Sequence, residues 1–89
     1  MKLKKGFVLR EVCGEKVIVG EGLDAIDFGK LLTLNESAAW LWEQAKEMGE
    51  FSVETLAERL CEEYDVEVNE ARADVEALVS EWQSMGVIA

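Results

Sequence analysis

The sequence predicts an α+β domain in which a three-stranded antiparallel sheet is followed by three helices. Short β-branched runs separated by glycines fill the first 34 residues, and apolar residues recur at helical spacing after that point. The charge balance changes there too: residues 1–30 hold six basic and five acidic residues, whereas residues 31–89 hold three and fourteen. Three helices packed on one face of such a sheet would bury a single core.

The expected strands are residues 7–12, 16–19 and 31–34. Between the first two we expect a type II′ turn at Gly14-Glu15, because a glycine in the first position of a two-residue loop accepts a positive φ. A sheet of three short strands has exposed edges. Their unpaired backbone N–H and C=O groups could pair with a strand from a partner.

The first expected helix runs to Gly49. Its start is predicted at Asn35 as N-cap, and a capping box of Thr33 with Glu36 is the alternative. Its apolar residues recur at helical spacing: Ala38, Leu41, Trp42, Ala45 and Met48.

Ser52 is predicted to cap the second helix, and the third begins between residues 67 and 69. Gly86 fits the left-handed end of the third helix, with Val87 placed to touch Trp82 as in a Schellman motif. The apolar side chains of this helix are expected on one face: Val68, Ala71, Val75, Leu78, Val79 and Trp82.

The composition argues against several classes of function. The net charge of −10 disfavours nucleic-acid and anionic-membrane partners, which require clustered Lys and Arg. The chain contains no histidine, so the commonest general base and zinc ligand is missing. We find no signal peptide, no membrane span and no linker, and we expect a single domain over residues 1–89 in the reducing cytoplasm.

The two cysteines, Cys13 and Cys61, are 48 positions apart without CxxC spacing. We expect Cys61 to act as a small hydrophobe on the core side of the second helix, and Cys13 to lie beside a turn. The acidic residues fall off the apolar stripes, as on a solvated face. No nucleophile elbow, P-loop or dinucleotide fingerprint is present. The sequence therefore predicts a protein without catalytic, metal-binding or cofactor-binding residues.

Trp40 is the one aromatic residue that does not lie on the apolar stripe of its expected helix. It points away from the side that carries Leu41 and Trp42. It either packs beneath a neighbouring element or belongs to a binding surface, and the sequence leaves both alternatives open.

Four segments, in order, resemble the PqqD family. They are residues 1–19 (MKLKKGFVLREVCGEKVIV), residues 33–43 (TLNESAAWLWE), Tyr64-Asp65-Val66 with residues 71–76 (ARADVE), and Gly86-Val87-Ile88. Each segment alone is mostly a common structural signal: residues 34–37 are a helix start, and Gly86-Val87-Ile88 is a helix stop. The ordered combination covers nearly the whole chain and is much more specific.

Members of this family, also called RiPP recognition elements, are similar to winged helix-turn-helix domains. The resemblance implies a non-catalytic adaptor that binds the leader of a ribosomally made precursor peptide. It would present that leader to a modifying enzyme, typically a radical SAM enzyme, as in the synthesis of pyrroloquinoline quinone (PQQ) or a related peptide product. The leader would pair with the third strand and pack on the third helix, at Leu31, Leu32, Thr33, Leu34, Arg72, Val75, Glu76 and Val79.

Two alternatives come from other functional classes. The same order of elements would suit a winged-helix DNA-binding regulator, but a recognition helix should be basic. The third helix carries Arg72 against five acidic residues: Glu67, Glu70, Asp74, Glu76 and Glu81. The other alternative is a structural module that self-associates through its exposed strand edge.

Overall fold

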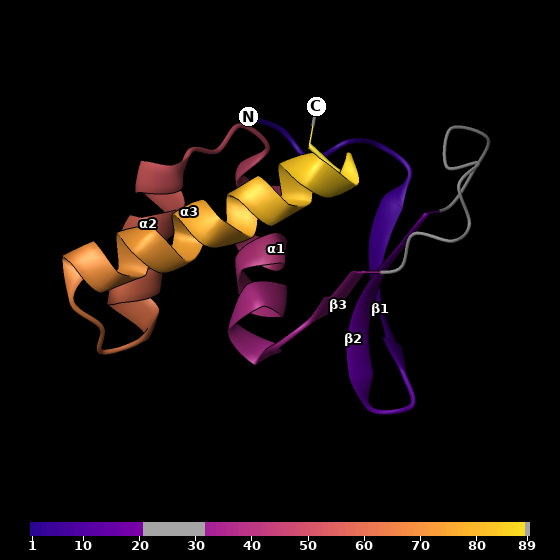
Figure 1. Ribbon diagram of the computed structural model, residues 1–89, viewed down its shortest axis with the longest axis horizontal. Coiled ribbons are helices and arrows are strands. Elements are labelled where there is room, and N and C mark those ends of the chain that lie inside the picture. The colour runs from indigo at the N-terminus through magenta and orange to yellow at the C-terminus, as the bar shows by residue number, and fades with distance from the viewer. Residues whose placement is uncertain (21–31, 89) are drawn as a thin grey trace.

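The computed structural model describes residues 1–20 and 32–88. Its elements are β1 (Phe7–Val12), β2 (Glu15–Gly20), β3 (Leu32–Leu34), α1 (Glu36–Met48), α2 (Val53–Glu63) and α3 (Val68–Met85). The three strands form one antiparallel sheet, which confirms the predicted fold class. In Figure 1 the sheet lies at one end of the molecule and α2 at the other, with α1 between them and α3 crossing in front.

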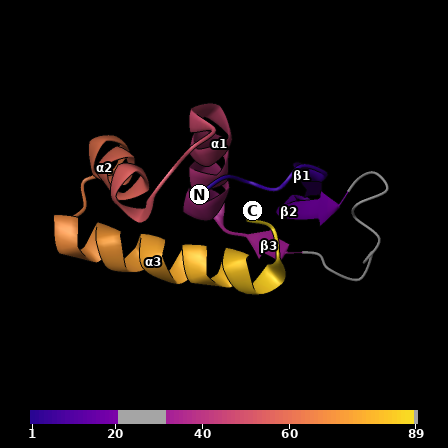
Figure 2. The same ribbon diagram turned by 90° about the horizontal axis from the view of Figure 1, so that it is seen from above.

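The sheet has the order β1-β2-β3, so β3 is an edge strand. Figure 2 shows that β3 lies on the α3 side of the sheet. The expected third strand began at residue 31, which lies outside the described residues, as does the predicted turn at Gly29-Lys30. No described strand pairs with the outer edge of β3.

The predicted turn between β1 and β2 is wrong by one residue. Val12 pairs with Glu15, so the loop is Cys13-Gly14 rather than Gly14-Glu15. Both loop residues have positive φ, 52° at Cys13 and 82° at Gly14, which is the pattern of a type I′ turn. Such a turn matches the right-handed twist of the two strands, and that match outweighs the cost of a left-handed cysteine.

The predicted capping residues lie at the ends of the helices. Asn35 Oδ1 accepts a hydrogen bond from the Ala38 amide at 2.8 Å, so Asn35 is the N-cap of α1. Ser52 and Thr55 form a reciprocal capping box at the start of α2. At the end of α3, Gly86 is left-handed and the Val87 amide donates to the Trp82 carbonyl at 3.1 Å, as in a Schellman motif.

Aromatic contacts join α1, α3 and the segment before α2. The Trp82 ring meets Trp42 edge-on, with centroids 5.2 Å apart, and meets Phe51 with centroids 6.5 Å apart. Trp82 is fully buried, and its Nε1 has no hydrogen-bond partner among the described residues. That unpaired donor costs about 1–3 kcal/mol. Burial of the indole contributes about 4–6 kcal/mol, at 25 cal/mol per Å² over about 150–250 Å², so packing prevails.

The N-terminal segment ties the sheet to the helices. Leu3 bridges to Ile88, and the Phe51 amide donates to the Met1 carbonyl at 2.8 Å. The Met1 ammonium donates to Glu50 Oε1 at 3.0 Å, and this contact holds the pKa of the Glu50 carboxyl below its usual range. Within the described ranges, no helix combines the length and apolar composition needed to cross a bilayer.

Replacing Ser52 by Ala should lower the free energy of unfolding by about 1 kcal/mol, because the Thr55 amide loses its capping acceptor. Urea denaturation followed by circular dichroism measures the change. Ser84→Ala is the matched control, since Ser84 is exposed within α3, and it should change stability by less than about 0.5 kcal/mol. Equal effects of the two substitutions would show that the capping box contributes nothing.

Candidate functional site

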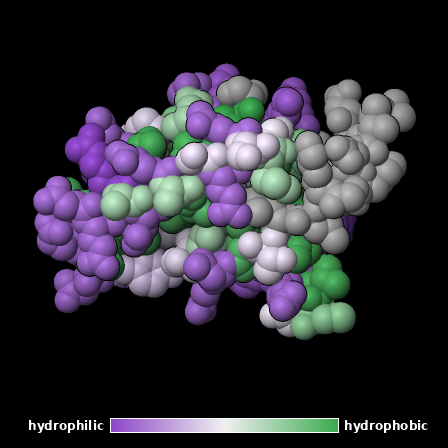
Figure 3. Space-filling model, viewed as in Figure 1, coloured by the Kyte–Doolittle hydropathy of each residue, from purple (hydrophilic) through white to green (hydrophobic). Residues whose placement is uncertain are grey.

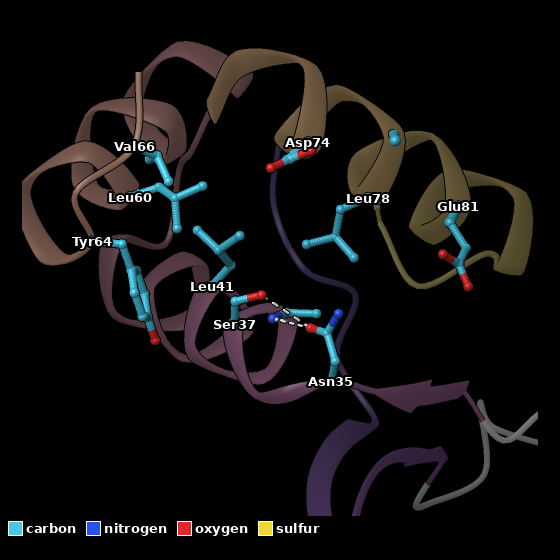
Figure 4. A pocket seen from close by; sticks show the side chains of 11 residues that line it. Asn35, Ser37, Leu41, Leu60, Tyr64, Val66, Asp74, Leu78 and Glu81 are labelled. Carbon is cyan, nitrogen blue, oxygen red and sulfur yellow. Dashed lines mark hydrogen bonds between the residues drawn. The ribbon is translucent and has the colours of Figure 1, made fainter. Parts of the chain in front are cut away.

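The candidate site is a groove between α3 and the start of α1, directly after the edge strand β3. Its volume is about 470 Å³, and Figure 4 shows its walls. One wall comes from α3, and the opposite wall from α1 and the α2–α3 connection. The lining residues are Asn35, Ser37, Ala38, Leu41, Leu60, Tyr64, Val66, Asp74, Ala77, Leu78 and Glu81.

The floor of the groove is apolar and its α3 rim is acidic. Leu41 and Leu60 are buried at the base, and the half-buried Leu78 points from α3 into the space (Figure 4). Asp74 and Glu81 are exposed on the same helix. They are seven residues apart, which places them about 10 Å apart along the helix axis. The groove therefore suits an apolar side chain flanked by cationic ones.

Asn35 offers a donor at the end of the groove nearest β3. Its Oδ1 accepts from the Ala38 amide and from Ser37 Oγ, at 2.8 and 3.1 Å. These two bonds fix the orientation of the amide, because the oxygen must face the helix start. The Nδ2 group donates to no residue in the described ranges, so it is left to bind a ligand carbonyl.

Two predicted site residues, Val75 and Val79, are core residues. Their side chains are 0% and 4% exposed, and both belong to the main hydrophobic cluster. Their assignment to a peptide-contacting surface does not fit this structure. The apolar face of α3 is buried by packing against the other helices. Neither valine lines the groove.

The predicted residues Arg72 and Glu76 are exposed but lie on the opposite flank of α3. Arg72 Nη2 donates to Glu54 Oε1 of α2 at 2.9 Å, and Arg72 Nε is 4.0 Å from Glu76 Oε1. Arg72 lines a different hollow, between α2 and α3. Neither side chain lines the groove.

None of the predicted strand residues that the structure describes lines the groove, but Leu34 directly precedes Asn35, which does. Thr33 is exposed, whereas Leu34 is buried beneath the sheet and pairs with Lys16 of β2. Leu32 pairs with Ile18 in the backbone register. Leu31 lies outside the described residues.

The sequence analysis missed the groove-facing residues of α3, Asp74, Ala77, Leu78 and Glu81. The helical pattern held a signal for them. Leu78 is displaced toward the edge of the apolar stripe. Asp74 and Glu81 are its neighbours on the helix surface at i−4 and i+3, and Ala77 and Glu81 are neighbours in the same way. Choosing this flank over the Arg72 flank requires knowing on which side of α3 the strand edge lies.

The described residues contain no group of three or more side chains suited to hold a metal ion. Both cysteines are free thiols: Cys13 is exposed, and Cys61 is half-buried and packs against the core. The groove itself holds carboxylates, hydroxyls and one amide, but no cysteine.

Comparison with known proteins identifies the family. The family model of coenzyme PQQ synthesis protein D (PqqD) matches residues 15–88. The chain belongs to the PqqD family. No curated protein matches it.

Two solved structures share the PqqD-like fold of this chain. One is TbiB1 in complex with the TbiA(beta) leader peptide, with a TM-score of 0.76 and 18% identity over 99% of this chain and 94% of the other. The second is lasso peptide synthetase B1 complexed with the leader peptide, with a TM-score of 0.75 and 23% identity over 99% and 95%.

Val75→Asp should unfold the domain, because a carboxylate at a fully buried position without a partner costs several kcal/mol. That cost approaches the whole stability of a small domain, about 5 kcal/mol at the low end. Circular dichroism measures it. Ala77→Asp, on the exposed flank of the same helix, should stay folded. A native spectrum for Val75→Asp would contradict the core assignment.

Proposed function

We propose that this protein is a non-catalytic adaptor that binds the leader segment of a ribosomally made precursor peptide. The observation that carries the proposal is the juxtaposition of an unpaired strand edge, β3, with the apolar groove beside α3. An extended peptide would add to β3 through backbone hydrogen bonds, which supply affinity without reading sequence. One or more of its side chains would enter the groove and supply selectivity.

The geometry of the groove supports a placement for the leader. The backbone of β3, including Thr33, would pair with the peptide, as predicted from the sequence for residues 31–34. The side-chain contacts would be made with Leu78, Ala77 and the residues around them rather than with the Arg72 flank. Asn35 Nδ2 would donate to a peptide carbonyl at the end of the strand.

The acidic rim of the groove would favour leader peptides without net negative charge. Asp74 and Glu81 form the α3 rim, and no described residue forms an ion pair with either of them. Binding a leader with net negative charge would bring like charges together in a partly apolar site. We therefore propose a leader that is basic or neutral where it crosses α3, with an apolar anchor between its polar residues.

The same charges argue against the winged-helix DNA-binding alternative. The exposed positions of α3 include Asp74, Glu76 and Glu81, and Arg72 is already paired with Glu54. In Figure 3, hydrophilic residues gather over the end of the molecule that holds α2 and the start of α3. A helix of this charge would repel phosphate groups.

The partner of the adaptor would be the enzyme that modifies the precursor, of the radical SAM class typical of the family. Two structural neighbours were solved with leader peptides bound, and this supports the adaptor role. The pathway would be PQQ synthesis or another peptide product. Action in the reducing cytoplasm agrees with two free thiols.

Leader binding is tested with a panel of fluorescein-labelled synthetic peptides in which an apolar residue lies between basic residues, with acidic versions of the same peptides for comparison. Ala77→Trp should weaken binding at least about tenfold, because the new indole would fill the groove, a change of about 1.4 kcal/mol. Fluorescence anisotropy measures the affinity. Ala73→Trp is the matched control, because Ala73 is an exposed alanine of α3 that does not line the groove.

Backbone pairing is tested separately with N-methylated leaders. Removing the peptide N–H groups that face β3 should abolish binding, whereas methylation at the alternate positions should have little effect. Equal affinity for both methylated series would overturn strand addition. Tight binding of duplex DNA with a steep salt dependence would overturn the adaptor proposal in favour of the regulator.

A further inference from the structure

Trp40 lies on a surface that the leader groove does not use. Its side chain is half-buried, and its ring meets Tyr64 edge-on with centroids 5.6 Å apart. Tyr64 is 37% exposed, so part of its ring is open to solvent beside Trp40. The structure thus combines both alternatives for Trp40: one side packs against the core, and the remainder faces solvent.

Two hollows flank the Trp40 ring. One, of about 420 Å³, lies between the sheet and α1, and its lining includes Leu9 and Lys16. The second, of about 450 Å³, lies between α1 and α2, and its lining includes Gln44 and Arg59. No lining residue of either hollow comes from α3, so this surface is separate from the groove except at Tyr64.

The rim of these hollows is acidic. We define the Trp40 patch as the two aromatic residues and the four carboxylates around them: Trp40, Tyr64, Glu36, Glu43, Glu62 and Glu63. The four glutamates are exposed, and none forms an ion pair with a residue in the described ranges.

The nearby cations do not neutralise the patch. Arg59 Nη1 donates to Gln44 Oε1 at 2.6 Å and lies 3.8 Å from Glu47 Oε1, so its charge is already engaged. Lys16 is the other cation lining the two hollows. Among the described residues, four carboxylates therefore face one ammonium group that forms no ion pair. The faces of indole and phenol rings attract cations, and arginine is the cation that stacks best on them.

We propose that the Trp40 patch is a second docking surface, which takes an arginine-bearing segment of the modifying enzyme while the groove holds the leader. This inference rests on the proposed adaptor function, which requires two partners to be bound at once. Charge complementarity selects the partner, since an acidic aromatic surface repels phosphate and anionic lipid. A second copy of this chain is disfavoured by its net charge of −10.

The probe is a blocked peptide, Gly-Arg-Gly-Arg-Gly, titrated into ¹⁵N-labelled protein. The indole N–H signal of Trp40 should shift, whereas those of Trp42 and Trp82 should not, because these rings are 1% and 0% exposed. The same peptide with citrulline in place of arginine keeps the shape and loses the charge. It should bind about threefold to tenfold more weakly, the range of a cation–π contact at a partly exposed site.

Variants locate the site. Trp40→Leu removes the indole reporter, so its binding is followed by the backbone amides of Glu43 and Tyr64, whose peptide-induced shifts it should abolish. Glu43→Gln should weaken binding while leaving the fold intact, because Glu43 is exposed. Glu70→Gln, an exposed residue of α3 outside both hollows, removes the same charge and should have no effect. An equal loss in Glu43→Gln and Glu70→Gln would reduce the effect to net charge and overturn the proposal.

Three further outcomes would overturn the proposed Trp40 docking surface. Equal binding of the arginine and citrulline peptides, or shifts confined to Ala77 and Leu78, would overturn the Trp40 patch. So would concentration-dependent sedimentation that Trp40→Leu abolishes, since the occupant would then be a second copy. Trp40→Leu should retain leader binding. If the wild-type protein binds no leader but the arginine peptide still shifts Trp40, the adaptor function fails and the Trp40 patch stands as a cation-binding surface.

Discussion

The packing of Trp82 against Trp42 and Phe51 is the contact on which the rest of the structure depends. It fixes α3 against α1 and against the segment that enters α2, so the C-terminal helix shares one aromatic centre with two elements that are at least 31 residues earlier in the chain. The left-handed Gly86 then turns the chain back, and Val87 is buried close by. Because α3 is held at this end, its Leu78 flank faces the start of α1. The groove exists because the helix cannot rotate about its axis without exposing an indole.

Because of this packing, different flanks of α3 serve the core and the candidate binding site. One flank of α3 is buried and carries Val75 and Val79, and a second is paired through Arg72 with α2. A third carries Leu78 and lines the groove together with Asn35, the residue after β3. Only the third is open to a ligand next to β3. The acidic residues that give the chain its charge then act locally, since some line the groove and others surround Trp40.

Much of the fold follows from local sequence signals. Asn35, Ser52 and Gly86 mark helix termini through short-range hydrogen bonds and backbone conformations, and each operates within a few residues. The hairpin turn was displaced by one residue, because type I′ and type II′ turns differ in which loop positions take a positive φ. The family resemblance over the same segments agrees with the family match over residues 15–88.

The candidate site was predicted only in part. Sequence periodicity identifies the apolar stripe of α3 but does not state how wide the buried part is, so Val75 and Val79 were placed on a surface that packing consumes. The sequence alone determined the order of elements, the helix boundaries, and the division into a nearly neutral strand half and an acidic helical half. Only the tertiary structure decided which flank of α3 borders β3, and that Trp40 meets Tyr64 at the surface. Those facts depend on how helices rotate as they pack, and helical periodicity leaves that rotation undefined until the partner surfaces meet.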